Sequence, residues 1–394
     1  MTHNAKHPEQ RLALYYAVLF ATIGSVGPFF ALWLNHKGID AAMIGVIAAA
    51  PSVAMVMTTM HIGAWADRLA DWRTAVLLSN WSIFLINCLL LVSNNAWFIL
   101  VIWTLGGVLM MAKIPIMDAA SLSLTNRRGT DYARVRVFGS VGFVLAVVTA
   151  GALFDRMGIQ AFIWVLLVGC VARILASHAL PQLRISDPVA ETPTDSTTND
   201  AGNSLFQPAI LLTIAGSALI NASHAFFYTF GMLQWSANGL SEFMSSLLWG
   251  SGVVAEIVLM WLFASVSKRV SARACLIIAG GAGILRWSIT AQQPDLAWLF
   301  FSQLLHAATF GLLFLATANF ISRRVSDSNA ARGQAFSATL TTSCMAIATL
   351  LSGLFYESWG VAVYRAMAVL CLVGVLLVAA SYRAGFVDRD PVGW

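Results

Sequence analysis

The chain alternates between long apolar segments and short polar ones. Each apolar segment holds about 20 residues with few charges, which is the length that an α-helix needs to cross a bilayer. Twelve such helices are expected, with approximate bounds of 11–34, 40–65, 74–92, 96–122, 134–154, 159–179, 207–231, 242–265, 274–291, 296–321, 332–355 and 360–382. The pattern therefore predicts an all-α integral membrane protein.

The composition agrees with this pattern. The chain has 394 residues, of which 59% are hydrophobic and only 10% charged, with a mean hydropathy of +0.76. Soluble domains carry about 25% charged residues, so a soluble fold is excluded. The five cysteines are scattered through apolar segments, and the seven histidines show no ligand spacing. No disulfide framework, metal site or enzymatic centre is expected.

The basic residues indicate the topology. A net charge of +5 could suggest a nucleic-acid partner, but the Lys and Arg residues form short clusters between the apolar segments. Most of them fall on one side of the membrane if the N-terminus is cytoplasmic, as the positive-inside rule requires. We expect a bacterial-type inner (plasma) membrane protein with both termini in the cytoplasm and no nucleic-acid partner.

The chain divides into two related halves. Residues 181–206 are rich in Pro, Ser, Thr and Asp without apolar periodicity, which predicts a cytoplasmic linker between bundles 1–180 and 207–394. Trp33…Gly38-Ile39-Asp40 recurs about 200 residues later as Trp235…Gly239-Leu240-Ser241. These matches predict two pseudo-symmetric six-helix bundles, the parallel-repeat layout of rocking transporters.

Five ionisable side chains lie inside the apolar segments, where each costs about 2.5–3.5 kcal/mol on insertion scales. They are Asp118, Arg136, Glu256, Arg286 and His306. Counting at 1.5 Å per residue from the intervening turns places the first two at a similar depth, roughly 12–15 Å from the cytoplasmic end. The other three lie on consecutive helices within about a turn of one another. Static helix clamps would be the alternative reading, but two clusters of matching depth favour a transport site.

The segment after the second apolar stretch carries a family signature. It reads GAWADRLADWR (63–73) and resembles the cytoplasmic-loop signature of the major facilitator superfamily, although its second glycine and two basic residues are replaced. The resemblance implies the twelve-helix major facilitator fold. It also implies that Gly63, Asp67, Arg68 and Arg73 form a gate that locks the cytoplasmic side until the halves rock.

Further motifs sharpen the resemblance. The segments DYARVRVFGSVGF (131–143), HAFFY (224–228), GVVAE (252–256), RW (286–287) and QLLHAATF (303–310) resemble the phenylpropionate:proton symporter family. The likeness covers nearly the whole chain. A more distant likeness is to the lactose permease family.

The resemblance assigns a substrate site to the N-terminal half. In the lactose permease family an acid on helix four and an arginine on helix five hold the substrate, and Asp118 and Arg136 match them by type, helix and spacing. Arg136, with Lys113, could hold a carboxylate by bidentate hydrogen bonds. Three aromatic residues are expected as ring-sized apolar walls: Phe29, Phe227 and Tyr228.

The resemblance also assigns proton coupling to the C-terminal half. Glu256, Arg286 and His306 match the glutamate, arginine and histidine of the family's coupling machinery, whereas Thr309 stands where the family has a second glutamate. Desolvation favours a protonated acid and a nearby cation favours its anion. Glu256 is thus the predicted proton carrier, His306 its modulator and Arg286 its counter-ion, with Asp118 as the rival proton site.

Together these features predict a proton-driven symporter that imports a small organic substrate, such as the aromatic carboxylate 3-phenylpropionate, by alternating access. The proton gradient replaces any cofactor, and a monomer is expected because one chain supplies both halves. A sugar, oligosaccharide or nucleoside symporter is the alternative within the class. A membrane sensor that binds without transporting is the alternative of another class.

Two local expectations complete the picture. Pro28, Pro51 and Pro115 should bend helices of the N-terminal half, whereas the C-terminal half has no proline well inside a span. Arg173 and His178, near the cytoplasmic end of the sixth span, are expected to extend towards lipid headgroups.

Overall fold

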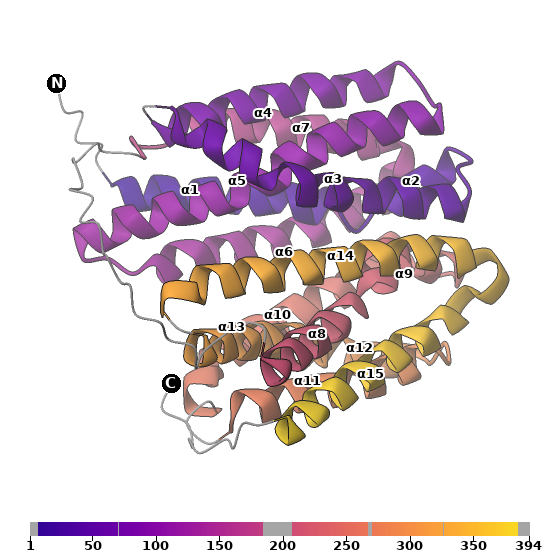
Figure 1. Cartoon of the computed structure of the whole chain (residues 1–394). Coiled ribbons are helices and arrows are strands. Elements are labelled where there is room, and N and C mark those ends of the chain that lie inside the picture. Colours follow the sequence, from indigo (N-terminus) through magenta and orange to yellow (C-terminus); the bar gives the residue numbers. More distant parts are fainter. Residues whose placement is uncertain (1–6, 70, 184–206, 267–269, 326, 385–394) are drawn as a thin grey trace. The chain divides into compact units, whose positions relative to one another are not determined.

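The computed structural model describes residues 7–69, 71–183, 207–266, 270–325 and 327–384, without the side chains of residues 59, 60, 63–67, 264–266, 327, 328, 330 and 331. These segments are helices joined by short connections (Figure 1). Two compact units share the chain, Met1–Pro193 with Trp235–Leu247 and Thr194–Gln234 with Leu248–Trp394. Almost all of the predicted linker 181–206 lies outside the described residues.

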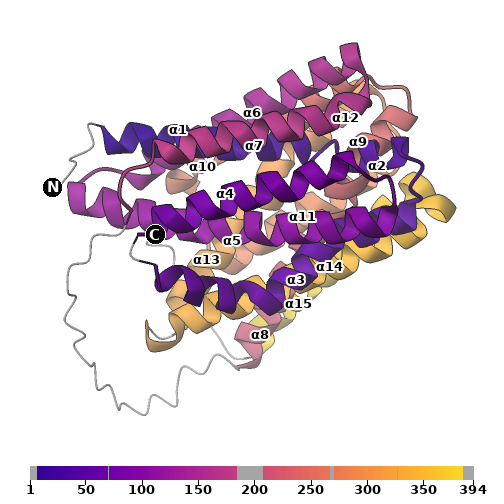
Figure 2. The same ribbon diagram turned by 90° about the horizontal axis from the view of Figure 1, so that it is seen from above.

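The helices of the N-terminal half are α1 (Pro8–Val26), α2 (Phe30–His36), α3 (Ala41–Asp67), α4 (Trp72–Cys88), α5 (Ala96–Arg128), α6 (Tyr132–Met157) and α7 (Phe162–His178). Single 3-10 turns stand at Leu89–Leu91 and Ile159–Ala161. Within this unit α4 and α5 run side by side in both views (Figures 1 and 2).

The helices of the C-terminal half are α8 (Pro208–Ala222), α9 (Ala225–Ala237), α10 (Glu242–Val266), α11 (Ala272–Thr290), α12 (Leu296–Leu304), the π-helix η3 (Ala307–Leu312), α13 (Leu313–Arg324), α14 (Asp327–Trp359) and α15 (Val363–Arg383). A 3-10 turn, Gly360–Ala362, joins the last two. The segment Trp235–Leu247 groups with the first unit, where the Glu242 N–H donates to the Asp155 carboxylate at 2.8 Å.

The twelve predicted spans are confirmed as helices. Within the described residues eleven helical stretches are long and apolar enough to cross a membrane, and the last of them, residues 332–383, has 52 residues. At 1.5 Å per residue that stretch is more than twice the thickness of a hydrocarbon core. It contains α14 and α15, which double back at their connecting turn (Figure 1). Large apolar side chains such as Trp261 (91%) and Val168 (69%) remain exposed, as lipid-facing residues do.

Within the described residues the tenth span passes into the π-helix η3, and the first and seventh spans are broken for two different reasons. The first span stops at Gly27 and resumes at Phe30, because Pro28 lacks a backbone N–H. Pro51 and Pro115, in contrast, lie inside the continuous helices α3 and α5. The seventh span is broken at residues 223–224 without any proline.

Small residues let particular helices approach closely. A Cβ at Gly24 of α1 would stand 2.6 Å from the Phe143 carbonyl oxygen of α6. In the other unit a Cβ at Gly216 of α8 would stand 2.6 Å from the Gly374 carbonyl oxygen of α15. Backbone contact through small residues replaces the hydrophobic driving force that helices lack in lipid.

The predicted internal repeat is visible in the backbone. Gly38 (φ 78°) and Gly239 (φ 83°) end α2 and α9 in the left-handed region that glycine tolerates. The next residue donates to the carbonyl five positions earlier in both places, at 3.2 Å and 3.0 Å. Asp40 and Ser241 then cap the following helices through N–H groups three residues later. The matching letters thus encode the same helix–turn–helix geometry twice.

Candidate functional site

The structure brings Asp118 and Arg136 to one polar centre in the N-terminal unit. Asp118 accepts hydrogen bonds from the hydroxyls of Tyr16 (2.6 Å) and Tyr132 (2.9 Å). Arg136 approaches the carboxylate only through Nε, at 3.9 Å, and its guanidinium stacks over the ring of Phe20 at 4.1 Å. The acid is therefore held mainly by hydroxyls, and Asp118 does not occupy the guanidinium fork.

Local sequence explains this arrangement. Gly129 (φ 65°) closes α5 and allows α6 to return antiparallel, which brings the two residues to one level. A Cβ at Gly139, one turn after Arg136, would meet the arginine Nη1 at 2.8 Å and the Phe20 ring at 2.9 Å. A side chain at position 139 would therefore displace the arginine–phenylalanine stack from its present place.

Lys113 lies in a different polar contact. It is buried, and its ammonium donates to the Asn80 side chain of α4 at 2.5 Å, while Asn80 donates to the Tyr15 hydroxyl at 3.2 Å. Within the described residues Lys113 therefore joins α4 rather than the Asp118–Arg136 pair. Phe29 is fully buried and packs edge-on against Phe154.

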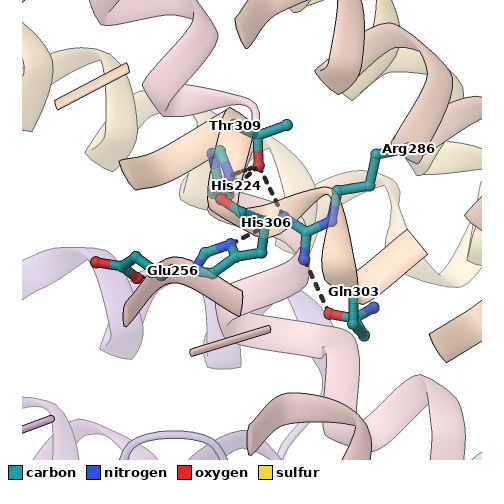
Figure 3. A network of polar contacts seen from close by, with 6 residues as sticks. All are labelled: His224, Glu256, Arg286, Gln303, His306 and Thr309. Atoms are coloured by element: carbon teal, nitrogen blue, oxygen red, sulfur yellow. Dashed lines mark hydrogen bonds and ion pairs between the residues drawn. The ribbon is translucent and has the colours of Figure 1, made fainter. Parts of the chain in front are cut away.

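Arg286 is the centre of a buried network in the C-terminal unit (Figure 3). Its Nη1 donates to His306 Nδ1 at 3.0 Å and to Thr309 Oγ1 at 3.1 Å, and its Nη2 donates to Gln303 Oε1 at 2.9 Å. The guanidinium is fully buried, with the ring of Trp287 at 4.4 Å. Three neutral acceptors thus hold one cation in place.

The chemistry of arginine fixes the protons on His306. A guanidinium can only donate, so His306 Nδ1 must accept and, in the neutral ring, Nε2 carries the proton. Nε2 lies 3.6 Å from Oε2 of Glu256, on the side of the ring opposite Arg286 (Figure 3). A second proton on His306 would require breaking its bond to Arg286.

The same reasoning orients the other branch of the network. Nδ1 of His224 faces the Asn221 carbonyl at 3.0 Å and must donate to it, so its neutral Nε2 accepts from the Thr309 hydroxyl at 3.0 Å. Thr309 in turn accepts from Arg286. Hydrogen bonds therefore run outward from Arg286 in both directions, to Asn221 and towards Glu256.

The helix that carries His306 and Thr309 is irregular at this place. The π-helix η3 (Ala307–Leu312) separates α12 from α13 and includes Thr309. Isolated π-helical turns recur at functional sites, because the extra residue redirects side chains. Gly252 and Gly311 make room on either side: their Cβ atoms would stand 3.2 Å from the His306 Cβ and 3.1 Å from the Glu256 Cγ.

Two of the three aromatic residues predicted for the substrate site, Phe227 and Tyr228, pack against this network. Phe227 stacks on Trp249 at 4.5 Å and lies 4.8 Å from the Arg286 guanidinium. Tyr228 stacks on the His224 ring at 5.4 Å. Both belong to the C-terminal unit, whereas Phe29 belongs to the N-terminal one.

The prediction missed His224 and Gln303 as members of the network. His224 was detectable as an ionisable residue inside an apolar span. Gln303 carries no such signal, since it is neutral and only the fold shows that it faces Arg286. Within the described residues no three His, Cys, Asp or Glu side chains converge as metal ligands would.

The cytoplasmic signature is only partly described. The side chains of Gly63 and Asp67 lie outside the described residues, and Arg68 is exposed. Arg73 donates to the carbonyl of His178 at the end of α7, at 2.7 Å. Asp71 caps α4 by accepting from the Arg73 N–H at 3.0 Å. Asp71, which replaces a basic residue of the family signature, therefore serves as the N-cap of α4.

Arg173 contradicts its prediction. It does not extend to the lipid headgroups but is buried, with Nη1 donating to Met110 Sδ at 2.7 Å and Nη2 to Cys170 Sγ at 3.0 Å. Helical side chains lean towards the N-terminus of their helix, which in α7 is the end away from His178. Arg173 also shares the buried face of α7 with Cys170, Ile174 and Ser177, at helical spacing, so its guanidinium lies inside the unit.

Comparisons with known proteins agree with the architecture. The family model described as "MFS_1 like family" matches residues 10–366. A curated relative, the "Probable 3-phenylpropionic acid transporter" of Escherichia coli (strain K12), is 29% identical over 93% of this chain and 96% of its own length. The "Maltose permease" of Geobacillus stearothermophilus is 22% identical over 93% of this chain and 92% of its own.

Solved structures share the fold at low sequence identity. The nucleoside transporter NupG superposes with a TM-score of 0.77 at 16% identity, covering 96% of this chain and 98% of that one. A D-xylose–proton symporter superposes with a TM-score of 0.71 at 10% identity, covering 98% and 99%. These matches concern the fold alone.

Proposed function

The chain belongs to the MFS_1 like family and is an integral membrane secondary transporter of the major facilitator superfamily, not an enzyme, and from this premise we propose that it is a proton-coupled symporter for a small aromatic carboxylate. The observation that carries the proposal is the hydrogen-bond chain that runs from Arg286 through His306 towards Glu256. Among the side chains of this hydrogen-bond network, one can accept a proton without breaking a hydrogen bond to Arg286.

That group is Glu256. His306 cannot take a second proton without losing its bond to Arg286 and adding a charge beside a buried cation. Glu256, with its side chain 16% exposed, can take a proton and become neutral. If Arg286 turns towards Glu256 during rocking, the cation favours the anion and releases the proton. The proton gradient is thus the proposed energy source, with no cofactor.

The substrate class rests on the relatives and on the cations of the N-terminal half. A relative of similar length is named as a probable 3-phenylpropionic acid transporter. Arg136 and Lys113 offer positive charge to a carboxylate, and Asp118 sets the position of Arg136. We also propose import across an inner (plasma) membrane by a monomer with cytoplasmic termini, gated by the signature around Asp67 and Arg68.

The test is the external pH of lightly buffered, de-energised cells that overproduce the protein. Addition of 3-phenylpropionate should make the medium alkaline, and the Glu256→Gln variant should abolish this response. Glu357→Gln is the matched control, because Glu357 is an exposed acid near the end of α14. Alkalinisation that persists in Glu256→Gln would transfer the proton to Asp118, to be checked with Asp118→Asn.

A sugar symporter is the second candidate. The relative named maltose permease covers nearly the whole chain, and the half-exposed Asp118, ringed by two tyrosine hydroxyls, resembles a hydrogen-bonding site for a neutral polyol. The same pH assay with a panel of sugars and nucleosides separates the two. A response to a sugar and none to the carboxylate would replace the first proposal.

A further inference from the structure

The first turn of α10 lies directly against the last turns of α6. Glu242, the first residue of α10, donates its backbone N–H to the Asp155 carboxylate of α6 at 2.8 Å. A Cβ at Gly151, one turn before Asp155, would stand 2.6 Å from the Glu242 carbonyl oxygen. A side chain at position 151 would therefore push the two helices apart, and the glycine lets their backbones meet.

The carboxyl groups of Asp155 and Glu242 face one another at this contact. They lie within hydrogen-bonding reach of each other. Glu242 Oε1 also accepts a hydrogen bond from the Ser236 hydroxyl of α9, at 3.3 Å. Among the ion pairs of the described residues, none joins either acid to a cation. The two acids therefore meet as like charges.

Three other titratable side chains belong to the elements around this end of α6. Arg156 follows Asp155 on α6 and is exposed. The helix α2 packs against the 3-10 turn that follows α6, and its end carries His36 and Lys37. His36 is exposed, and the Lys37 ammonium donates to the Asn94 side chain at 2.5 Å. The protonation of the pair is thus governed mainly by the two acids themselves.

A shared proton converts the repulsion between the two carboxylates into attraction. The protonated acid donates an O–H···O⁻ bond, which is short and about twice as strong as a bond between neutral groups. Asp155 is exposed and Glu242 is half-buried, so the pair can take its proton from the surrounding water. The contact between α6 and α10 therefore has two states, one tightened by a shared proton and one loosened by two negative charges.

The boundary between the two compact units runs through α10. Residues up to Leu247 belong to the first unit with α6, whereas Leu248 and the rest of α10 belong to the second. Alternating access moves such units relative to one another, and a helix shared by both must then bend or release one of its ends. The contact with Asp155 holds the end that lies in the first unit. Its strength should therefore influence how readily the units move.

We propose that Asp155 and Glu242 form a proton-dependent latch, which holds the start of α10 on α6 while the two carboxyl groups share a proton and releases it when both are ionised. With the cytoplasmic termini proposed above, the fifth span ends on the outer face of the membrane, so the latch responds to the external pH. The inference rests on the proposed function for alternating access and for this orientation. It does not depend on the substrate or on Glu256.

The sign of the response agrees with import driven by protons. A low external pH favours the shared proton and keeps the latch closed, whereas a high external pH ionises both acids and opens it. The latch thus closes under the same condition that supplies the coupling network with a proton. Closing at that stage would keep the bound proton from returning to the outside.

The first experiment measures the separation of two spin labels by electron paramagnetic resonance in the purified full-length protein. Leu153→Cys on α6 and Phe243→Cys on α10 place the labels at exposed positions beside the latch, and protein without these two cysteines gives the background. Between acidic and alkaline buffer the ratio of long to short separations should rise about 10-fold. Glu242→Gln, whose amide can donate to Asp155 at any pH, should keep the short separation throughout.

Glu357→Gln, at an exposed acid of α14, is the control and should respond to pH like the wild type. A wild type whose label separation does not change with pH overturns the inference, and so does a pH response that survives in Glu242→Gln. If Glu242→Gln does not fold, Asp155→Asn decides. An asparagine still accepts from the Glu242 N–H and can donate to its carboxylate, so it should likewise abolish the response.

The consequence for transport is measured separately, as exchange of 3-phenylpropionate in right-side-out membrane vesicles of the Glu256→Gln variant. Exchange should rise about 5-fold as the external pH rises, and adding Glu242→Gln should remove this dependence. A dependence that persists in the double variant overturns the inference. Absence of exchange, with the pH-dependent label separation intact, would refute the proposed substrate and support the latch. Normal exchange without any pH-dependent separation would refute the latch alone.

Discussion

The two halves of the molecule treat a buried arginine in opposite ways. In the C-terminal half, the terminal nitrogens of Arg286 donate hydrogen bonds to one nitrogen and two oxygen acceptors. In the N-terminal half, the terminal nitrogens of Arg173 donate to two sulfur atoms. Both leave Nε without a partner, so the difference lies in the terminal nitrogens, the groups that form the fork for a carboxylate.

This difference separates two tasks. A cation that is satisfied by its own protein needs no ligand, and its network can hold a set number of protons until a helix moves. A cation whose terminal nitrogens meet only sulfur is held less firmly, and it lies in the half that carries Asp118 and Arg136. We therefore expect changes in the C-terminal half to affect coupling and changes in the N-terminal half to affect substrate affinity.

The breaks in the first and seventh spans carry the comparison further. Pro28 breaks the first span through its missing N–H. The seventh is broken at His224, whose Nδ1 bonds to the Asn221 carbonyl in the preceding turn. One break is built into the backbone, whereas the other depends on a side chain that belongs to the Arg286 network.

The largest effect is expected from Arg286→Lys. An ammonium cannot reach three acceptors that the planar fork reaches together, and buried acceptors without a donor are costly. Uphill accumulation driven by a proton gradient should fall about 100-fold or more. Substrate exchange across the membrane should fall much less.

The check is to measure accumulation and exchange in the same proteoliposomes. Arg365→Lys is the matched control, because Arg365 is exposed on α15. If Arg286→Lys lowers both rates equally, the C-terminal network serves binding or folding rather than coupling.

A smaller effect, of the other kind, is expected from Arg136→Lys. The substitution keeps the charge but removes the guanidinium plane that stacks on Phe20. Accumulation and exchange should fall together, by about 10-fold, because both need the substrate to enter. Arg134→Lys, at an exposed position on the same helix, is the control. Loss of accumulation alone would place Arg136 in the coupling machinery and abolish the division between the halves.

The fold could be predicted from the sequence because the features that define it are read along the chain. Apolar length identifies a span, and counting from a turn gives depth, which is how Asp118 and Arg136 were matched before any contact was known. The repeat was readable because glycine at 38 and at 239 answers a backbone requirement that other residues meet poorly.

The hydrogen-bond partners of the charged side chains could not be predicted from the sequence. Lys113 and Asp118 are five residues apart, yet Lys113 turns to Asn80, and only the packing of α4 against α5 decides this. The position of Arg173 near the end of its span predicted contact with the headgroups, whereas the residue belongs to the buried face of α7 with Cys170 and Ile174. Neutral polar members such as Gln303 and Thr309 leave no trace in hydropathy.

Thr309→Val should have a moderate effect. The change removes the hydroxyl that joins Arg286 to His224 but keeps the volume, so two buried groups each lose one partner. Accumulation should fall about 5- to 10-fold with exchange preserved, and Thr309→Ser should restore it. Thr317→Val is the control, since the Thr317 hydroxyl bonds to the Leu313 carbonyl of its own helix. Equal losses in Thr309→Ser and Thr309→Val would remove the hydroxyl from the coupling path.

The smallest effect is expected from Gly311→Ala, which sharpens the comparison without removing any polar group. The new Cβ would stand 3.1 Å from the Glu256 Cγ, so the acid must shift by a few tenths of an ångström relative to His306. Accumulation should fall about 2- to 3-fold, with exchange unchanged.

Gly281→Ala is the counterpart, because a Cβ there meets nothing within 4 Å. In the middle of α11 it should leave transport unchanged and stabilise the protein by about 0.5–1 kcal/mol through helix propensity, measured by thermal unfolding. If the two alanines behave alike in transport, the position of Glu256 beside His306 does not limit coupling, and the network acts through Arg286 alone.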